Sequence, residues 1–82
     1  MLVQLKWEYA EGEIDTKTTK LICIPARGKR QFGPDEFDAD LCIQDGMNFC
    51  IANIHLGDAD SSNILCQEIV RRWNEFPEEL KR

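Results

Sequence analysis

The 82-residue sequence lacks most of the features that accompany a chemical activity. It has no run of about 18 apolar residues, the minimum for a membrane-spanning helix. Its five glycines are scattered, so no loop is built to cradle phosphate groups. A single histidine, His55, leaves little from which to assemble a nucleophile, a base and an orienting group. The sequence therefore predicts a protein that is not an enzyme and holds no cofactor.

Basic residues are missing from the middle of the chain. No lysine or arginine occurs from Gln31 through Val70, although the chain as a whole has ten of them and a net charge of −5. A field of one sign repels nucleic acid and attracts basic protein surfaces. We therefore expect a basic protein partner and neither nucleic acid nor membrane, unless the acidity only maintains solubility. The candidate partner-binding residues are Asp35, Glu36, Asp38, Asp40, Asp45, Asp58 and Asp60.

A secretion signal is also not apparent. The N-terminal stretch MLVQLKWEY has neither the basic start nor the long apolar centre of such a signal. The sequence thus predicts a cytoplasmic protein whose thiols stay reduced.

The cysteines are not spaced as a structural zinc site. Such sites bring ligands in close pairs such as C-x2-C, whereas at least seven residues separate any two cysteines here. We expect buried, free thiols that pack as small apolar groups. The alternative is a cysteine-based zinc or redox protein that uses Cys23, Cys42, Cys50, Cys66 and His55.

The apolar pattern predicts one domain of short strands followed by a helix. Alternation in LVQLKWEY is typical of a half-buried strand, and the segment before Pro25 is rich in threonine and isoleucine. The stretch ARGKRQFGPDEFD contains glycine and proline and changes charge sign, which predicts an exposed loop, either a plain connection or a functional one. The expected strands are residues 2–9, 14–24, 39–43 and 47–54, and the expected loop is residues 26–38.

The stretch CIQDGMNFC predicts a hairpin, and its register decides whether its two cysteines can meet. With Gln44-Asp45-Gly46 as the loop and Gly46 in a left-handed bulge, Ile43 opposes Met47, Leu41 opposes Phe49, and one face becomes wholly apolar. Burying each large side chain is worth about 1.5–3 kcal/mol, so this register is favoured. It makes Cys42 and Cys50 diagonal neighbours about 7–8 Å apart. A disulfide between them is therefore not expected.

The last part of the chain predicts an amphipathic helix at about residues 59–76. Asp58, Asp60 and Ser61 are candidates for its N-terminal cap, and apolar residues follow at helical spacing. Pro77 ends the helix and leaves a short exposed tail at residues 77–82. We predict an α+β fold, in which an antiparallel sheet of three or four strands carries this helix on one face.

The order of hairpin, GDAD and SSNILCQEIVRRWNEF resembles small phage and prophage accessory proteins. The likeness covers about residues 39–76 and is carried by Asn63, Leu65, Ile69, Trp73 and Asn74. It implies a compact protein of a mobile element that occupies a host protein, such as an anti-CRISPR or other anti-defence inhibitor, some of which imitate DNA. It implies no catalytic residues.

Together these features predict a non-enzymatic protein-binding module. In this hypothesis a monomer or homodimer in the host cytoplasm docks its acidic surface on a basic, nucleic-acid-binding site of a host defence complex. Two alternatives stay open. One is the cysteine-based zinc or redox protein. The other is a homo-oligomeric phage structural or assembly protein that uses an exposed sheet edge at DTKTTK and the second face of the hairpin.

Overall fold

The protein has the predicted α+β fold. The computed structural model describes residues 1–45 and 47–81, which form two small antiparallel sheets and one long C-terminal helix. The elements are β1 Leu2–Trp7, β2 Ala10–Asp15, β3 Leu21–Ile24, β4 Asp38–Ile43, β5 Cys50–His55, α1 Ala59–Glu75 and the short 3-10 helix η1 Glu78–Leu80.

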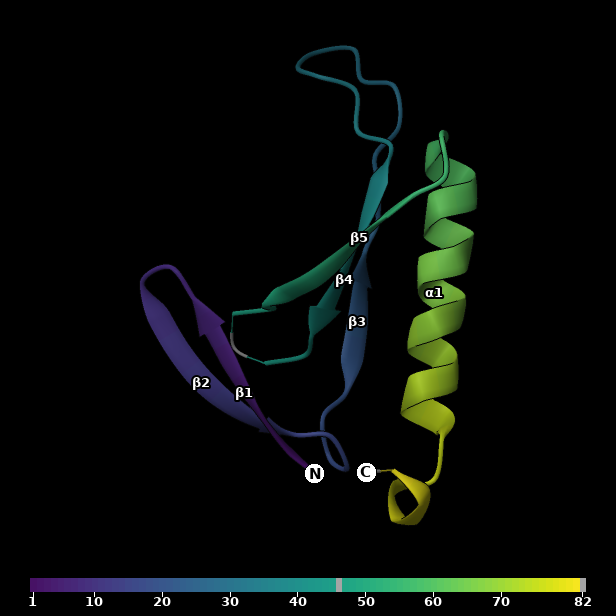
Figure 1. Ribbon diagram of the computed structural model, residues 1–82. Coiled ribbons are helices and arrows are strands. Elements are labelled where there is room, and N and C mark those ends of the chain that lie inside the picture. The colour runs from purple at the N-terminus through teal and green to yellow at the C-terminus, as the bar shows by residue number, and fades with distance from the viewer. Residues whose placement is uncertain (46, 82) are drawn as a thin grey trace.

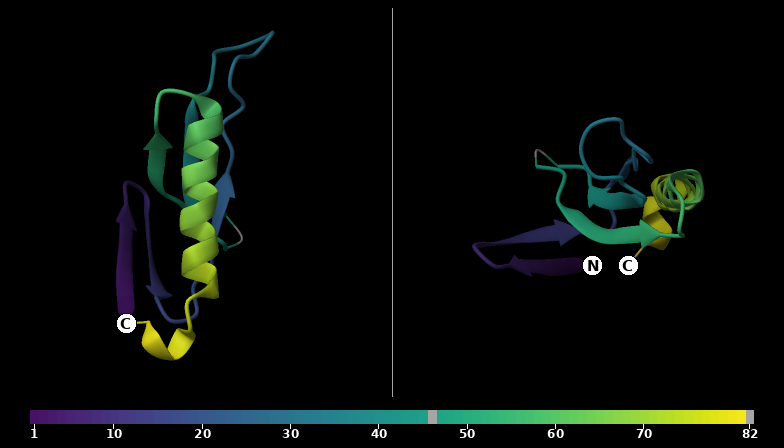
Figure 2. Two further views of the ribbon diagram at one scale, coloured as in Figure 1. Left: turned by 90° about the vertical axis from the view of Figure 1, so that its right-hand side faces the viewer. Right: turned by 90° about the horizontal axis from the view of Figure 1, so that it is seen from above.

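The two sheets and the helix occupy different sides of the molecule. Strands β3, β4 and β5 pair in that order, and α1 runs along one side of this sheet (Figure 1). The β1–β2 hairpin forms a separate two-stranded sheet away from α1, at the lower left of Figure 1 and of the view from above in Figure 2, and its Leu5 and Ile14 pack against the same buried residues as Trp73 of α1. The long β3–β4 connection extends beyond the sheet at the end far from both chain termini. The predicted helix on one face of a three-stranded sheet is thus confirmed.

The single strand predicted for residues 14–24 is wrong. Asp15 turns the chain: its carbonyl oxygen accepts hydrogen bonds from the amides of Thr18 and Thr19, and its side chain accepts one from the amide of Lys17 at 2.9 Å. An aspartate that bonds to the backbone two residues ahead favours a turn over a strand. The segment DTKTTK is therefore mostly a turn and not a free sheet edge, so the assembly hypothesis loses one of the two features on which it was based.

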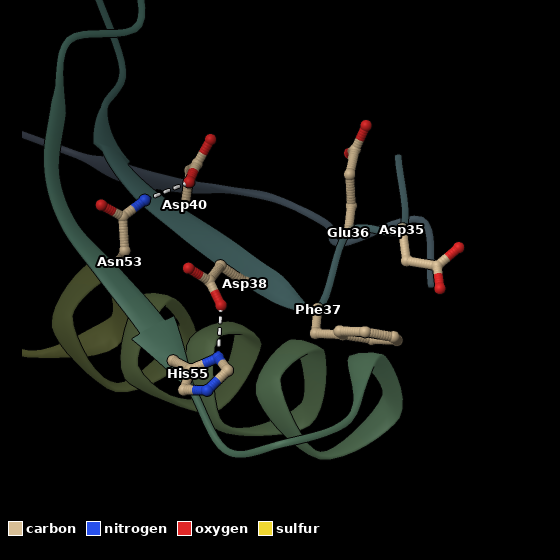
Figure 3. A pocket seen from close by; sticks show the side chains of 7 residues that line it. All are labelled: Asp35, Glu36, Phe37, Asp38, Asp40, Asn53 and His55. Atoms are coloured by element: carbon tan, nitrogen blue, oxygen red, sulfur yellow. Dashed lines mark hydrogen bonds and ion pairs between the residues drawn. The ribbon is translucent and has the colours of Figure 1, made fainter. Parts of the chain in front are cut away.

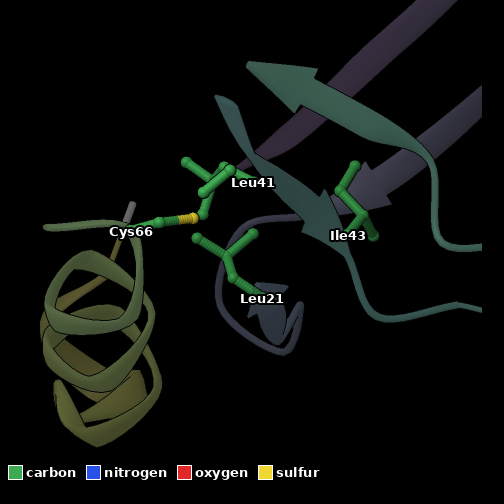
Figure 4. Packing of buried hydrophobic residues seen from close by; sticks show 5 residues of the cluster. Leu21, Leu41, Ile43 and Cys66 are labelled. Atoms are coloured by element: carbon green, nitrogen blue, oxygen red, sulfur yellow. The ribbon is translucent and has the colours of Figure 1, made fainter. Parts of the chain in front are cut away.

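The core lies between the three-stranded sheet and α1. Leu21, Leu41, Ile43 and Cys66 meet there with Ala39, as Figure 4 shows. The positions on β4 alternate, so that residues 39, 41 and 43 point to the helix and residues 38, 40 and 42 to the opposite face. This alternation places the polar side chains of β4 on the face that the helix leaves open.

Helix α1 begins and ends where the sequence indicates. Asp58 is the N-cap and accepts a hydrogen bond from the Ser61 amide at 2.7 Å, and Phe76 is the C-cap just before Pro77. The tail after Pro77 is not simply exposed, because Lys81 is buried and its Nζ lies 4.6 Å from the centre of the Trp73 ring.

Two asparagines bind α1 to the outer edge of β3. Asn74 accepts a hydrogen bond from the Leu21 amide and donates one to the Leu21 carbonyl, both at 2.8 Å. Asn63 does the same at Ala26, two residues beyond the end of β3, at 2.7 and 3.0 Å. Each amide side chain thus forms the two hydrogen bonds that a neighbouring strand would form. Without it, these backbone groups at the edge of the sheet would have no partner.

The register of β4 and β5 differs from the predicted one. Leu41 pairs with Ala52, and after a bulge Cys42 pairs with Cys50, so the predicted partnership of Leu41 with Phe49 is wrong. The loop between the strands is longer than three residues, and Asn48 in it takes a left-handed conformation with φ of 51°. The predicted left-handed conformation of Gly46 falls outside the described residues.

The predicted loop is confirmed between β3 and β4, but it is not irregular throughout. Gly28 and Glu36 form an isolated antiparallel bridge, with hydrogen bonds of 2.6 and 2.9 Å. Gly28 has a φ of 75°, which suits glycine. The bridge folds the loop back on itself and brings its basic first half beside its acidic second half.

Neither helix of the described chain is long and apolar enough to span a membrane.

Candidate functional site

The open face of β4 and β5 carries three successive cross-strand pairs of polar or ionisable side chains. Asp38 lies opposite His55, Asp40 opposite Asn53 and Cys42 opposite Cys50. The His55 ring nitrogen Nδ1 is 2.5 Å from Asp38 Oδ1, and Asn53 Nδ2 donates to Asp40 Oδ1 at 2.5 Å. Directly opposed side chains on one face of an antiparallel pair interact in this way.

An acidic pocket lies at the loop end of this face. Its volume is about 430 Å³, and its lining combines carboxylates with one aromatic ring and the two polar partners from β5. Figure 3 shows the carboxyl groups of Asp38 and Asp40 reaching toward His55 and Asn53, with Glu36 and Asp35 on the adjoining loop. The lining residues are Asp35, Glu36, Phe37, Asp38, Asp40, Asn53 and His55.

The carboxylates of the pocket differ in whether a basic side chain forms an ion pair with them. Glu36 forms ion pairs with Arg30 at 2.8 Å and Arg27 at 3.9 Å, both from the loop that the Gly28 bridge folds back. Asp40, by contrast, is bonded to a neutral amide and forms no ion pair within residues 1–45 and 47–81. The basic patch of the loop thus reduces the charge at one rim of the pocket and leaves Asp40 available to a cation from outside.

The structure gathers four of the seven predicted acidic residues. Asp35, Glu36, Asp38 and Asp40 line the pocket, but the other three do not. Asp45 accepts a hydrogen bond from the Met47 amide in the β4–β5 loop. Asp58 caps α1, where the hydrogen bond from the Ser61 amide lowers the pKa of its carboxyl group, and Asp60 lies in the first helical turn.

Three lining residues were not among the predicted partner-binding residues. Asn53 and His55 alternate with apolar positions on β5, and a polar residue every second position would have indicated a shared open face. Phe37 is half-buried beside four carboxylates and supplies the apolar wall of the pocket. No local signal in the sequence separates Phe37 from an ordinary core residue.

The cysteines form two pairs on opposite faces of the sheet. Cys23 and Cys66 lie near each other on the helix side, and Cys42 and Cys50 are cross-strand partners on the open face. His55 lies beyond Asn53 on β5 and bonds to Asp38. In the described residues no three or more histidine, cysteine, aspartate or glutamate side chains are placed to hold a metal ion. The zinc alternative therefore has no support from this arrangement.

Burial of two thiols should make the folded state less stable at alkaline pH. Burial raises the pKa of Cys42 to about 11 and that of Cys66 to about 12, from an ordinary value of 9.0. The folded chain therefore keeps protons that the unfolded chain releases above pH 9, so we expect stability to be full below pH 9 and to fall as pH rises toward these values. Urea midpoints measured from about pH 8 to about pH 11 test this expectation. The slope should be smaller in Cys66→Ala, and an equal slope would contradict the assignment.

The comparisons with known proteins do not assign the chain to a family. No protein-family model matches it, and no curated protein or solved structure shows significant similarity to it. The resemblance to phage and prophage proteins therefore stays a prediction, and the functional argument depends on the pocket itself.

Proposed function

We propose that the protein is a non-enzymatic binding module whose acidic pocket receives a basic side chain of a partner protein, with arginine preferred. The observation that carries this proposal is that four acidic residues line one open pocket, and that Asp40 forms no ion pair with a basic side chain among the described residues. The predicted inhibitor of a host defence complex is one protein of this kind, in which the arginine belongs to a nucleic-acid-binding surface.

Arginine fits the pocket better than lysine for two physical reasons. A guanidinium group can donate two parallel hydrogen bonds to a carboxylate, and the carboxylates of Asp38 and Asp40 lie two residues apart on the same face of β4. The ring of Phe37 offers an apolar surface on which a planar guanidinium can stack. The same pocket is less suited to imitating a long run of DNA phosphates, because Asp45, Asp58 and Asp60 do not line it.

Removing the two strand carboxylates should weaken binding strongly. For Asp38→Asn/Asp40→Asn we expect the Kd of an arginine-rich peptide to rise by about tenfold or more, because both substitutions remove charge and preserve shape. Isothermal titration calorimetry of the folded variants measures the change. Raising salt from about 0.1 M to about 1 M shortens the Debye length from about 10 Å to about 3 Å and should weaken wild-type binding as well.

Two controls separate this pocket from general acidity. Asp58→Asn/Asp60→Asn removes the same charge away from the pocket and keeps an asparagine at the helix cap, so it should leave the Kd nearly unchanged. Arg30→Gln removes the shorter of the two ion pairs of Glu36 and should tighten binding. If the two double variants weaken binding equally, net charge and not the pocket determines binding, and the proposal is wrong.

A further inference from the structure

The cysteine pair on the open face has a geometry that the predicted register did not allow. Cys42 and Cys50 are direct partners in the β4–β5 ladder, after the bulge at Leu41 and Cys42. The amide of Ile43 donates to the carbonyl of Phe49 at 2.8 Å, one residue outside the pair on each strand. This bond marks a non-hydrogen-bonded pair, in which opposite Cα atoms are about 4.5 Å apart and side chains are closest.

That spacing lies within the range of a disulfide. Bridged cysteines usually have Cα atoms about 4.4–6.8 Å apart, so the bond requires little movement of either strand. The two cysteines are direct cross-strand partners, so their side chains point to the same face of the sheet. We propose that Cys42 and Cys50 are a cross-strand dithiol that is converted to a disulfide by low-molecular-weight disulfides.

The two sulfurs have different access, which gives the reaction an order. Cys50 is exposed; its thiol donates to the Ala52 carbonyl at 3.4 Å, and its sulfur accepts from the Asn53 amide at 3.9 Å. Cys42 is only 2% exposed, and burial, with smaller contributions from Cys50, Asp40 and Cys23, raises its pKa. Because the thiolate is the attacking form, Cys50 is the thiol that meets a reagent first.

The exchange then proceeds in two balanced steps. The Cys50 thiol loses its proton, and its sulfur attacks the small disulfide to form a mixed disulfide and release one thiolate. The Cys42 thiol loses its proton, its sulfur attacks the Cys50 sulfur, and the second small thiolate leaves. The two released protons convert these thiolates to thiols. Two cysteines are thus oxidised and one small disulfide is reduced to two thiols.

The second cysteine pair provides a comparison within the same molecule. Cys23 and Cys66 also lie near each other, but Cys66 is 0% exposed and lies in the core between the helix and the sheet. A reagent cannot reach Cys66 without local opening of the core, which costs part of the folding free energy. Oxidation of the native protein should therefore select the open-face pair.

Peptide mapping of the folded protein tests the proposal with oxidised glutathione as the probe. After oxidation and blocking of free thiols, cleavage on the amino side of aspartate separates Cys42, in residues 40–44, from Cys50, in residues 45–57. In the wild-type protein we expect these two peptides to be joined, and reduction to separate them. The joined species should be lost in Cys50→Ser and retained in Cys23→Ser, and circular dichroism checks that both variants are folded.

Three results would overturn the proposal. A glutathione adduct that stays on Cys50 without closing to Cys42 shows that the pair cannot bridge. A link between Cys23 and Cys66 shows that oxidation selects the core pair. A link between two protein molecules shows that Cys50 is a surface thiol without an intramolecular partner.

Discussion

Leu41→Ala should lower the free energy of unfolding by about 2–5 kcal/mol, the largest effect of any single substitution considered for this chain. Leu41 is 8% exposed and lies on the central strand, where it packs with Leu21 and Cys66 beneath α1. Truncation leaves a cavity that the neighbouring strands cannot fill, since both are hydrogen-bonded to β4. Domains of this size have only about 5–15 kcal/mol of stability, so a substantial part should be lost.

Urea denaturation followed by circular dichroism measures this loss. The matched control is Ile64→Ala, which also truncates a branched side chain but lies on α1 with 68% of its surface exposed. We expect a change within about 0.5 kcal/mol for the control. Equal effects of the two substitutions would show that Leu41 is not in the core.

Loss of the asparagines that hold α1 to β3 is expected to have the second largest effect. Asn74→Ala removes two hydrogen bonds and leaves the amide and carbonyl of Leu21 without partners at a half-covered edge. Each unsatisfied buried group costs about 1–3 kcal/mol, so Asn74→Ala and Asn63→Ala should each be as destabilising as a moderate core truncation.

Hydrogen exchange distinguishes this mechanism from a general loss of stability. In Asn74→Ala the Leu21 amide should exchange faster than the other amides of β3, and in Asn63→Ala the Ala26 amide, just beyond β3, should exchange faster than the amides of β3. Gln67→Ala, on the exposed face of α1, controls for helix propensity and should change neither rate. Uniform acceleration over β3 in both variants would contradict the local role of the asparagines.

These asparagines also explain why the sequence of α1 resembles the helix of small phage proteins. Asn63, Trp73 and Asn74 carry much of the resemblance to phage proteins, and in the structure all three attach the helix to the segment around β3. Trp73 donates its ring N–H to the Thr19 carbonyl at 2.9 Å. A helix of this type therefore has a structural explanation, and the resemblance adds no direct support for a partner.

The helix and the fold class could be predicted because their signals are local and repeated. Apolar residues at helical spacing, a capping aspartate and a following proline all agree on one helix. The break between β2 and β3 could not be predicted in this way, because threonine and isoleucine favour strands. The turn depends instead on the backbone hydrogen bonds of Asp15.

The register of β4 and β5 could not be obtained from alternation alone. Alternation assumes that both strands are uninterrupted, but the register shift leaves Ile51 without a partner in the ladder, between the partners of Leu41 and Cys42. An added residue on one strand reverses which face its later side chains reach. The sequence-based register therefore separated Cys42 from Cys50, and the structure brings them together.

The candidate site was predicted in part, for a related reason. The absence of lysine and arginine in the middle of the chain pointed to its acidic residues, four of which line the pocket. It could not show that Arg30 folds back to pair with Glu36, because that contact depends on the bridge between Gly28 and Glu36. Nor could it show that Asn53 and His55 complete the pocket from another strand.

Chemical-shift mapping with an arginine-rich peptide tests the proposed binding pocket most directly. In the uniformly labelled protein we predict saturable shifts at the amides of Asp38, Asp40, Asn53 and His55, which diminish at high salt and are lost in Asp38→Asn/Asp40→Asn. Shifts that concentrate instead at Asp58 and Asp60, or that spread over all acidic residues, would show that this pocket is not the binding site.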